Sequence, residues 1–241
     1  MAIGSLSACG ANPAPNAASA APGAAAATIW QLAPAELLIQ GGYDGILSVA
    51  EVQRHGDLGL AGADRLDGEM VLVDGQFYQF LASGQVVQPP STMRLPFAEV
   101  TAWTGGRAIP VTPGLVYDDS SMPTLDSRLD LNAFYAVRME GAWDTLVVRT
   151  FRQQSKPYLP LDSAVHHQAV DTLVNVRGVM VGFRQPQYAK PMSLPNYHLH
   201  FITADRTRGG HVLGFRARDV TMQVSERPEF TVHMPPAAPM P

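Results

Sequence analysis

Residues 196–213 read NYHLHFITADRTRGGHVL and predict a β-hairpin that gathers three histidines. Side chains two residues apart on a strand point to the same face, so His198 and His200 are expected to lie side by side. The run DRTRGG is rich in turn-forming residues and would return the chain as an antiparallel strand that brings His211 to the same point. The stretch therefore predicts a strand-rich fold around a cluster of imidazoles.

Three imidazoles at one point suit a divalent metal ion. Neutral imidazoles bind Zn²⁺ and neighbouring divalent ions, and three protein ligands leave a fourth tetrahedral position open for water or substrate. A structural zinc site would need a fourth ligand, and no cysteine lies near the cluster. The pattern predicts a catalytic Zn²⁺ held by His198, His200 and His211. An ordinary surface or hydrogen-bonding His-x-His pair is the alternative.

The composition excludes several classes of protein. The chain has 241 residues, of which 46% are hydrophobic, enough to bury a substantial core. The net charge is -4 and no basic run occurs, so the chain has no electrostatic footprint for nucleic acid. The single cysteine, Cys9, excludes an internal disulfide. No apolar stretch reaches the roughly 18 residues that span a bilayer.

The two ends of the chain differ from the rest. Residues 1–27 consist largely of Ala, Pro, Gly, Ser and Asn, which predicts a disordered leader or linker. Leu6-Ser-Ala-Cys9 is similar to a bacterial lipobox, which would make Cys9 a lipid anchor, but the basic and apolar parts of such a signal are missing. Both a cytoplasmic location and export as a lipoprotein therefore stay open. The proline-rich tail, 235–241, is expected to form neither helix nor strand.

Short β-runs dominate the middle of the chain. Residues 69–73 and 76–80 flank Asp74-Gly75, which predicts a hairpin with a type I′ turn. Further β-rich runs are 134–139, 145–151, 173–183, 197–203, 211–217 and 220–224. Many strands with few helices predict a β-rich α+β fold. Prolines at 157 and 160 suggest a boundary between a β-rich N-terminal subdomain, 28–155, and a C-terminal subdomain with the histidine hairpin, 156–234.

Several stretches together resemble the alpha-acetolactate decarboxylase family, in the family's order. They are GYDG at 42–45, HGDLGL at 55–60, LDGEM at 66–70, NAFYAVR at 132–138, VR at 148–149, QSKPY at 154–158, GVMVGF at 178–183 and the histidine segment at 196–213. The resemblance implies two packed, sheet-containing subdomains with zinc between them, and a homodimer. It also implies the non-oxidative decarboxylation of 2-acetolactate to acetoin and CO₂.

The resemblance further implies roles for two charged residues. Arg149 matches the family's active-site arginine, whose guanidinium fork suits the substrate carboxylate, with Arg138 as the weaker choice. Glu69 matches a substrate-binding glutamate that protonates the enediolate, whose charge the Lewis-acidic Zn²⁺ stabilises. An ordinary surface charge is the alternative for both. The family's second, C-terminal glutamate has no match, and neither Glu226 nor Glu229 aligns with it.

Two other classes of function stay open. One is a different mononuclear zinc lyase or hydrolase, because an open three-histidine site serves a zinc-bound hydroxide equally well. A cupin is a weaker option, because Ala204 stands where its motif has a glutamate. The other is an exported, non-catalytic metal-binding protein. A decarboxylase needs Arg149 and Glu69 near the metal, whereas a zinc-storage protein needs neither.

Overall fold

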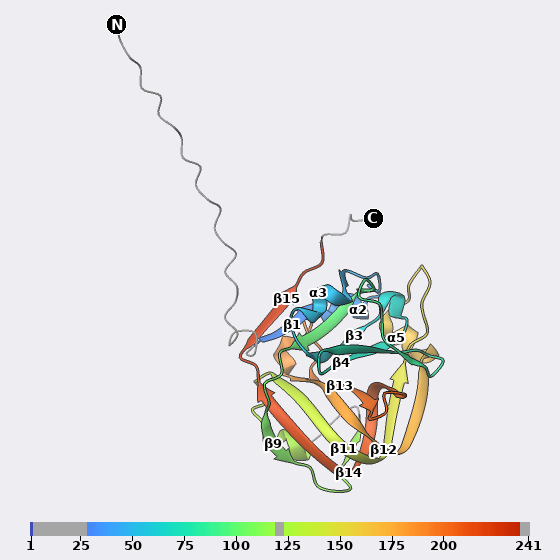
Figure 1. Cartoon of the computed structure of the whole chain (residues 1–241), viewed down its shortest axis with the longest axis vertical. Coiled ribbons are helices and arrows are strands. Elements are labelled where there is room, and N and C mark those ends of the chain that lie inside the picture. The colour runs from blue at the N-terminus through green and yellow to red at the C-terminus, as the bar shows by residue number, and fades with distance from the viewer. Residues whose placement is uncertain (2–27, 119–122, 237–241) are drawn as a thin grey trace.

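The computed structural model describes Met1 and residues 28–118 and 123–236, which form two main β-sheets (Figure 1). The first sheet has seven strands in the order β15-β1-β8-β3-β4-β5-β6. They are β1 (Thr28–Leu32), β3 (Leu58–Gly62), β4 (Glu69–Val73), β5 (Gln76–Phe80), β6 (Val86–Val87), β8 (Phe97–Thr101) and β15 (Glu229–His233). The predicted leader at 2–27, with Cys9, and most of the predicted tail lie outside the described residues.

The second sheet is built from longer strands. Its order is β10-β14-β11-β12-β13, and β9 also pairs with β14. They are β9 (Arg107–Pro110), β10 (Val116–Asp118), β11 (Tyr135–Thr150), β12 (Ala169–Gln185), β13 (Asn196–Thr203) and β14 (Gly209–Glu226). Because β13 also pairs with β14, the strands β14, β11, β12 and β13 close into a ring. Trp143 and Phe201 pack edge to face inside its hydrophobic core, with ring centroids 5.1 Å apart.

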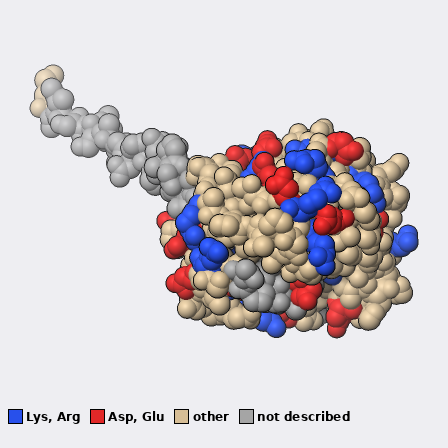
Figure 2. All heavy atoms as spheres, turned by 90° about the horizontal axis from the view of Figure 1, so that it is seen from below, with Lys and Arg blue, Asp and Glu red and all other residues tan. Residues whose placement is uncertain are grey.

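Helices are few and short, as the β-rich prediction requires. The elements besides the main sheets are β2 (Leu47–Ser48), β7 (Arg94–Leu95), α2 (Ala35–Ile39), α3 (Val49–Gln53), α4 (Pro123–Asp126), α5 (Leu161–Ala164) and the 3₁₀ turns η1 (Asp64–Leu66), η2 (Val165–His167) and η3 (Gln187–Ala189). None of the helices in the described ranges is long and apolar enough to cross a membrane. Acidic and basic side chains are interspersed on the face that Figure 2 shows.

The local predictions for the first half of the chain are confirmed at one hairpin in particular. β4 and β5 pair antiparallel around Asp74 and Gly75, whose φ angles are 51° and 77°. Both values are positive, as a type I′ turn needs. This turn sets the register of the strand that begins with Glu69.

The sheets divide the chain at a different place from the predicted boundary at 155/156. That boundary falls between β11 and β12, which are paired neighbours in the second sheet. The second sheet already begins with β9, and the last strand, β15, returns to the first sheet beside β1. The prolines at 157 and 160 interrupt the pattern because they lie in the connection between two hairpin strands, where no ladder hydrogen bonds are needed.

The β11–β12 connection is held against the N-terminal part of the chain. The Asp44 carboxylate accepts hydrogen bonds from Lys156 Nζ at 2.6 Å and from the Tyr158 hydroxyl at 2.8 Å. The Tyr43 hydroxyl donates to the Leu159 carbonyl at 3.0 Å. Two of the family-like motifs, 42–45 and 154–158, therefore meet in space, and their contact holds the segment that carries Leu161.

Candidate metal centre and active site

The three histidines of the predicted hairpin come together. His198 and His200 lie on β13, and His211 lies near the start of β14, directly opposite His200. The centroids of the three rings are 5.2 to 5.3 Å from one another. All three side chains are buried, and His200 is fully so. The hairpin prediction is confirmed, and the arrangement of its side chains is that of a possible metal centre.

The hydrogen bonds of two rings leave their second nitrogens free to face the cluster. Nδ1 of His200 lies 2.7 Å from the Met70 carbonyl oxygen, which can only accept, so this nitrogen donates. Nδ1 of His198 lies 3.2 Å from a carboxylate oxygen of Glu99. When Nδ1 holds the proton, the lone pair is on Nε2, as a metal ligand requires.

The distances and the charge state also fit a divalent ion. Nε2 of His200 and Nδ1 of His211 are 3.3 Å apart. Two nitrogens bound at about 2.0–2.1 Å to a tetrahedral zinc are separated by about 3.3 Å. Burial lowers the pKa of His200 and of His211 well below the ordinary value, so both rings are held neutral. Neutral rings at this spacing are suited to hold Zn²⁺ or a similar ion.

Arg149 lies beside this cluster because of an irregularity in the sheet. On β11 it pairs with His211, so the two side chains share a face. The register shifts between Val147, which pairs with Gly214, and Val148, which pairs with Val212. Without this bulge Arg149 would face Val212, and its side chain would be out of phase with the histidines.

Glu69 reaches the cluster from the other sheet. Its carboxylate oxygens lie 3.7 Å from Nε2 of His200 and 4.0 Å from Nε of Arg149. The backbone N–H of Glu69 donates to Thr150 Oγ1, which in turn donates to the Phe80 carbonyl. Burial raises the pKa of the Glu69 carboxyl, while the positive charge of the nearby Arg149 guanidinium opposes the rise.

These residues line one cavity between the two sheets. Its walls come from β3, β4 and β8 of the first sheet, from β11, β13 and β14 of the second, and from nearby loops. The lining residues are Leu38, Leu60, Ala61, Gly62, Leu66, Glu69, Phe97, Arg149, Phe151, Leu161, Leu194, His198, His200 and His211. Most of the wall is apolar, and the buried Nε of Arg149 has no hydrogen-bond partner. The site can therefore exclude water and still offer a donor to an anionic group.

The remaining acidic and basic candidates lie elsewhere. Arg138 is engaged by Asp74 at 2.9 Å and Glu140 at 2.5 Å, and it does not line the cavity. Glu226 and Glu229 do not line it either, and Glu229 accepts a hydrogen bond from Thr28. The structure thus brings Glu69, Arg149 and the three histidines together and leaves the weaker candidates outside.

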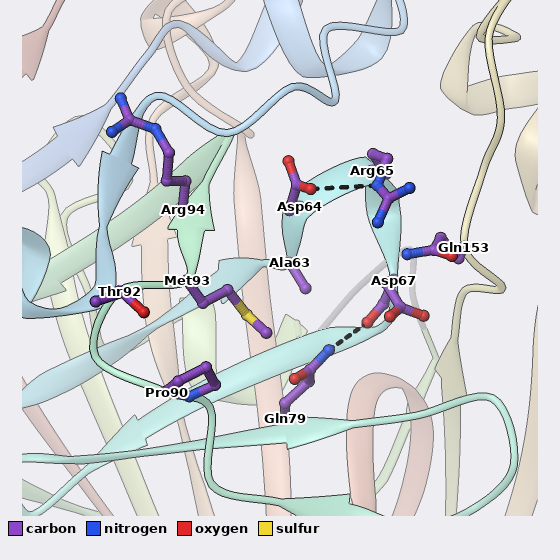
Figure 3. A pocket seen from close by; sticks show the side chains of 10 residues that line it. All are labelled: Ala63, Asp64, Arg65, Asp67, Gln79, Pro90, Thr92, Met93, Arg94 and Gln153. Carbon is purple, nitrogen blue, oxygen red and sulfur yellow. Dashed lines mark hydrogen bonds and ion pairs between the residues drawn. The ribbon is translucent and has the colours of Figure 1, made fainter.

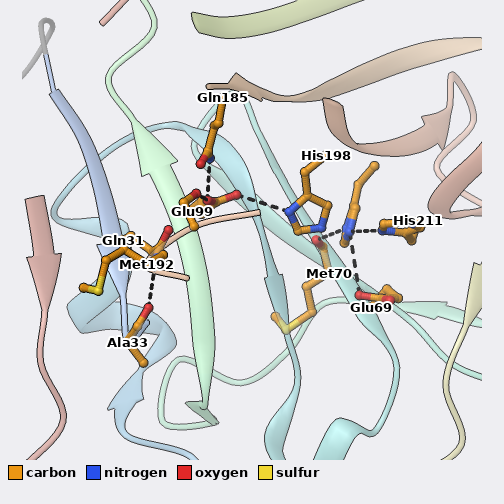
Figure 4. Close-up of polar contacts among 11 residues, drawn as sticks. Gln31, Ala33, Glu69, Met70, Glu99, Gln185, Met192, His198 and His211 are labelled. Atoms are coloured by element: carbon orange, nitrogen blue, oxygen red, sulfur yellow. Dashed lines mark hydrogen bonds and ion pairs between the residues drawn. The ribbon is translucent and has the colours of Figure 1, made fainter. Parts of the chain in front are cut away.

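Glu99 is a residue of the site that the sequence did not predict. It lies on β8, is fully buried, and contacts His198 (Figure 4). Nothing in the run FAEVT at 97–101 distinguishes this residue from a glutamate on the solvent face of a half-buried strand. What marks Glu99 as buried is the position of β8 between β1 and β3 in the interior of its sheet, which the strand order shows and the local sequence does not.

A second hollow lies on the outer side of the β3–β4 connection and has a different character. Figure 3 shows Asp64 paired with Arg65, and Gln79 donating to the Asp67 carbonyl. This hollow is lined by none of the histidines, and its acidic and arginine side chains are partly exposed. The cavity at the three histidines is therefore the candidate active site.

Gly210 offers a test of how the backbone places His211. Its φ is +153°, and a Cβ there would lie 2.6 Å from the Arg149 carbonyl oxygen. We expect Gly210→Ala to lower the free energy of unfolding by about 2–6 kcal/mol, from about 1–3 kcal/mol of backbone strain and about 1–3 kcal/mol of steric overlap. Urea unfolding of the variant measures this loss.

Gly105→Ala is the matched control for Gly210→Ala. Gly105 also has a positive φ, +93°, but nothing lies within 4 Å of a Cβ at this position. It should show the backbone strain alone, about 1–3 kcal/mol. Equal losses for the two variants would mean that the contact with Arg149 has no energetic effect.

Comparisons with known proteins agree with one another. The family profile described as alpha-acetolactate decarboxylase matches residues 29–239. The alpha-acetolactate decarboxylase of Methanosarcina mazei is 37% identical over 204 residues, covering 80% of this chain and 69% of that protein. The one from Bacillus subtilis strain 168 is 32% identical, covering 87% and 82%. A crystal structure of the Bacillus subtilis protein superimposes with a TM-score of 0.83 at 33% identity, covering 88% of this chain and 90% of that one.

Proposed function

Because the chain belongs to the alpha-acetolactate decarboxylase family, as its motifs predicted, we propose that it converts 2-acetolactate to acetoin and CO₂. The observation that supports this most directly is the buried cavity in which three histidines, Arg149 and Glu69 converge. A metal-storage site would need neither of the two charged residues near the metal. Their positions favour a reaction on an anionic substrate.

The metal is proposed to be Zn²⁺, held by Nε2 of His198 and His200 and by His211. The spacing of the nitrogens, their burial and their neutral state support this assignment. When bound, the ion would supply Lewis-acid stabilisation of the negative charge that loss of CO₂ leaves on the substrate. Three protein ligands leave a position for that substrate.

Arg149 is proposed to bind the substrate carboxylate. Its Nε is buried without a hydrogen-bond partner, and its guanidinium packs 5.2 Å from the centroid of the Phe151 ring. An arginine fork can hold a carboxylate in one orientation, next to the histidine cluster. As CO₂ leaves, the guanidinium loses its charged partner, so the apolar walls from Leu60, Leu161 and Leu194 favour departure of the neutral product.

Glu69 is proposed to deliver the proton that completes acetoin. Among the residues that line the cavity it is the single carboxyl group. Burial raises its pKa, which favours a carboxyl that retains a proton for transfer. Its backbone is held by Thr150, the neighbour of Arg149, so the acid and the carboxylate-binding group are positioned by one hydrogen bond between the sheets.

The proposal is tested by incubating the purified protein with racemic 2-acetolactate and measuring acetoin and CO₂. We expect acetoin to form far faster than spontaneously, to stop after chelation and to return with added zinc. The absence of acetoin from folded protein that carries one zinc would reject the decarboxylase and leave another zinc lyase or hydrolase. Activity that survives complete chelation would reject the metal role while keeping the reaction.

A further inference from the structure

We propose that Glu99 is a positioning residue that holds His198 in the orientation and tautomer needed to bind the metal. The inference rests on the metal site of the proposed function. Oε2 of Glu99 lies 3.2 Å from Nδ1 of His198, on the side of the ring that faces away from the other two histidines (Figure 4). A carboxylate that accepts the Nδ1 proton leaves the Nε2 lone pair for the ion and makes the imidazole a stronger ligand.

The surroundings of Glu99 are built to keep its carboxylate in place. The side chain is fully buried, and its other oxygen, Oε1, accepts hydrogen bonds from Gln185 Nε2 at 2.6 Å and Ser193 Oγ at 3.1 Å. A buried carboxylate is costly unless it is hydrogen-bonded and paired with positive charge. In the described part of the chain, the one ionisable side chain that contacts it is His198. A dication bound to His198 would supply the missing positive charge through the ring.

A second hydrogen-bonded layer supports the segment that carries Ser193. The Gln31 side-chain amide, on β1, donates to the carbonyls of Met192 and Ala33, both at 2.6 Å (Figure 4). Gln31 and Glu99 lie on neighbouring strands of the first sheet, where they are register partners. His198 lies on the second sheet, so this network joins the two sheets at the metal site. Metal affinity should therefore depend on a residue of the sheet that contributes none of the three histidines.

The three histidine rings have different hydrogen-bond partners, so the role proposed for Glu99 applies to His198 alone. His200 is held by the Met70 carbonyl, which no side-chain substitution removes. Nδ1 of His211 contacts Nε2 of His200 itself, at 3.3 Å. Among the residues the structure describes, Glu99 is thus the single charged group that contacts the nitrogen of a histidine ring that is turned away from the proposed ion.

The variant that tests the inference is Glu99→Gln. The introduced amide keeps the shape of the side chain, and its oxygen can still accept from His198. Its nitrogen can donate to Oε1 of Gln185, which is buried without a partner, once that side chain flips. The variant therefore removes the negative charge and leaves the packing. We expect its dissociation constant for zinc, measured by competition with a chromophoric chelator, to rise about 10–100-fold.

Two further variants separate positioning from general damage to the fold. Asp126→Asn removes a different carboxylate, at the end of α4, which lies 3.6 Å from Arg184 of the second sheet and outside the cavity, and should leave zinc affinity unchanged. Ser193→Ala removes one hydrogen bond to Glu99 and keeps the charge, so it should weaken zinc binding less than Glu99→Gln does. The ¹⁵N shifts of the His198 ring in the zinc-loaded protein should change in Glu99→Gln and stay as in the wild type in Asp126→Asn.

The measurements distinguish failure of the role of Glu99 from failure of the proposed metal site. Wild-type zinc affinity in both Glu99→Gln and Ser193→Ala overturns the role of Glu99 and leaves the decarboxylase untouched. Equal losses of affinity in Glu99→Gln and Asp126→Asn also overturn it, because the effect would then be general. Failure of the wild-type protein to bind zinc at all overturns the metal site itself. If Glu99→Gln does not fold, Ser193→Ala becomes the test. Wild-type zinc affinity and wild-type ¹⁵N shifts of the His198 ring in that variant would then overturn the role of Glu99.

Discussion

Replacing Arg149 by alanine is expected to lower kcat/KM for 2-acetolactate by about 10²–10³-fold, the usual cost of removing one preorganised charged donor from a buried site. The bound zinc should stay at the wild-type level, because Arg149 is a neighbour of the histidines and not a ligand. Acetoin assays together with metal analysis of the purified variant measure the two quantities separately.

Two control substitutions make this result interpretable. Arg138→Ala removes a guanidinium from the same strand, but one that is paired with Asp74 and Glu140 outside the cavity, so its kcat/KM should stay near that of the wild type. Arg149→Lys keeps the charge and loses the fork, and should recover part of the activity. Parallel loss of zinc and activity in Arg149→Ala would contradict substrate binding and indicate a structural role.

Replacing His211 by alanine should remove both metal and activity. Substitution of a residue that only hydrogen-bonds to a metal ligand already costs about 10–100-fold in metal affinity. Loss of one of the three ligands themselves should therefore cost more than about 100-fold. His211 is the gentlest of the three to remove, because no carbonyl or carboxylate would be left without its donor. Zinc titration and the acetoin rate at saturating zinc measure the effect.

His167→Ala is the matched control for His211→Ala. His167 is exposed in the η2 turn and does not line the cavity, so the variant should bind zinc and form acetoin as the wild type does. Full zinc affinity in His211→Ala would show that the cluster does not hold the ion. Zinc bound with wild-type affinity but without activity would place His211 in the chemistry and not in the metal site.

The sequence predicted the parts of the fold that depend on neighbouring residues. The Asp74-Gly75 turn and the histidine hairpin were correct because turn preference and strand periodicity act over a few residues. The runs at 134–139 and 145–151 were correctly predicted to form strand, but they belong to one sixteen-residue strand, β11. Gly141, between them, has a φ of +145° that continues the strand where the pattern suggested a break.

The order in which the strands pair was harder to predict from the sequence than the hairpins were. The boundary suggested by the prolines separates β11 from β12, although these two strands pair with each other. Strand pairing brings together residues far apart in the chain, and short-range patterns do not contain that information. Arg149 and Glu69 were singled out by family resemblance, whereas spacing alone marked only the histidines.

The sequence by itself determined that strands dominate this chain, that a hairpin gathers His198, His200 and His211, and to which family the chain belongs. The tertiary structure decided which residues surround those histidines. The bulge on β14 turns Arg149 to their face, and the packing of the two sheets brings Glu69 and Glu99 to them. The physical reason is range: a hairpin forms from adjacent residues, but the charge around a buried imidazole is set by whichever distant strands pack against it.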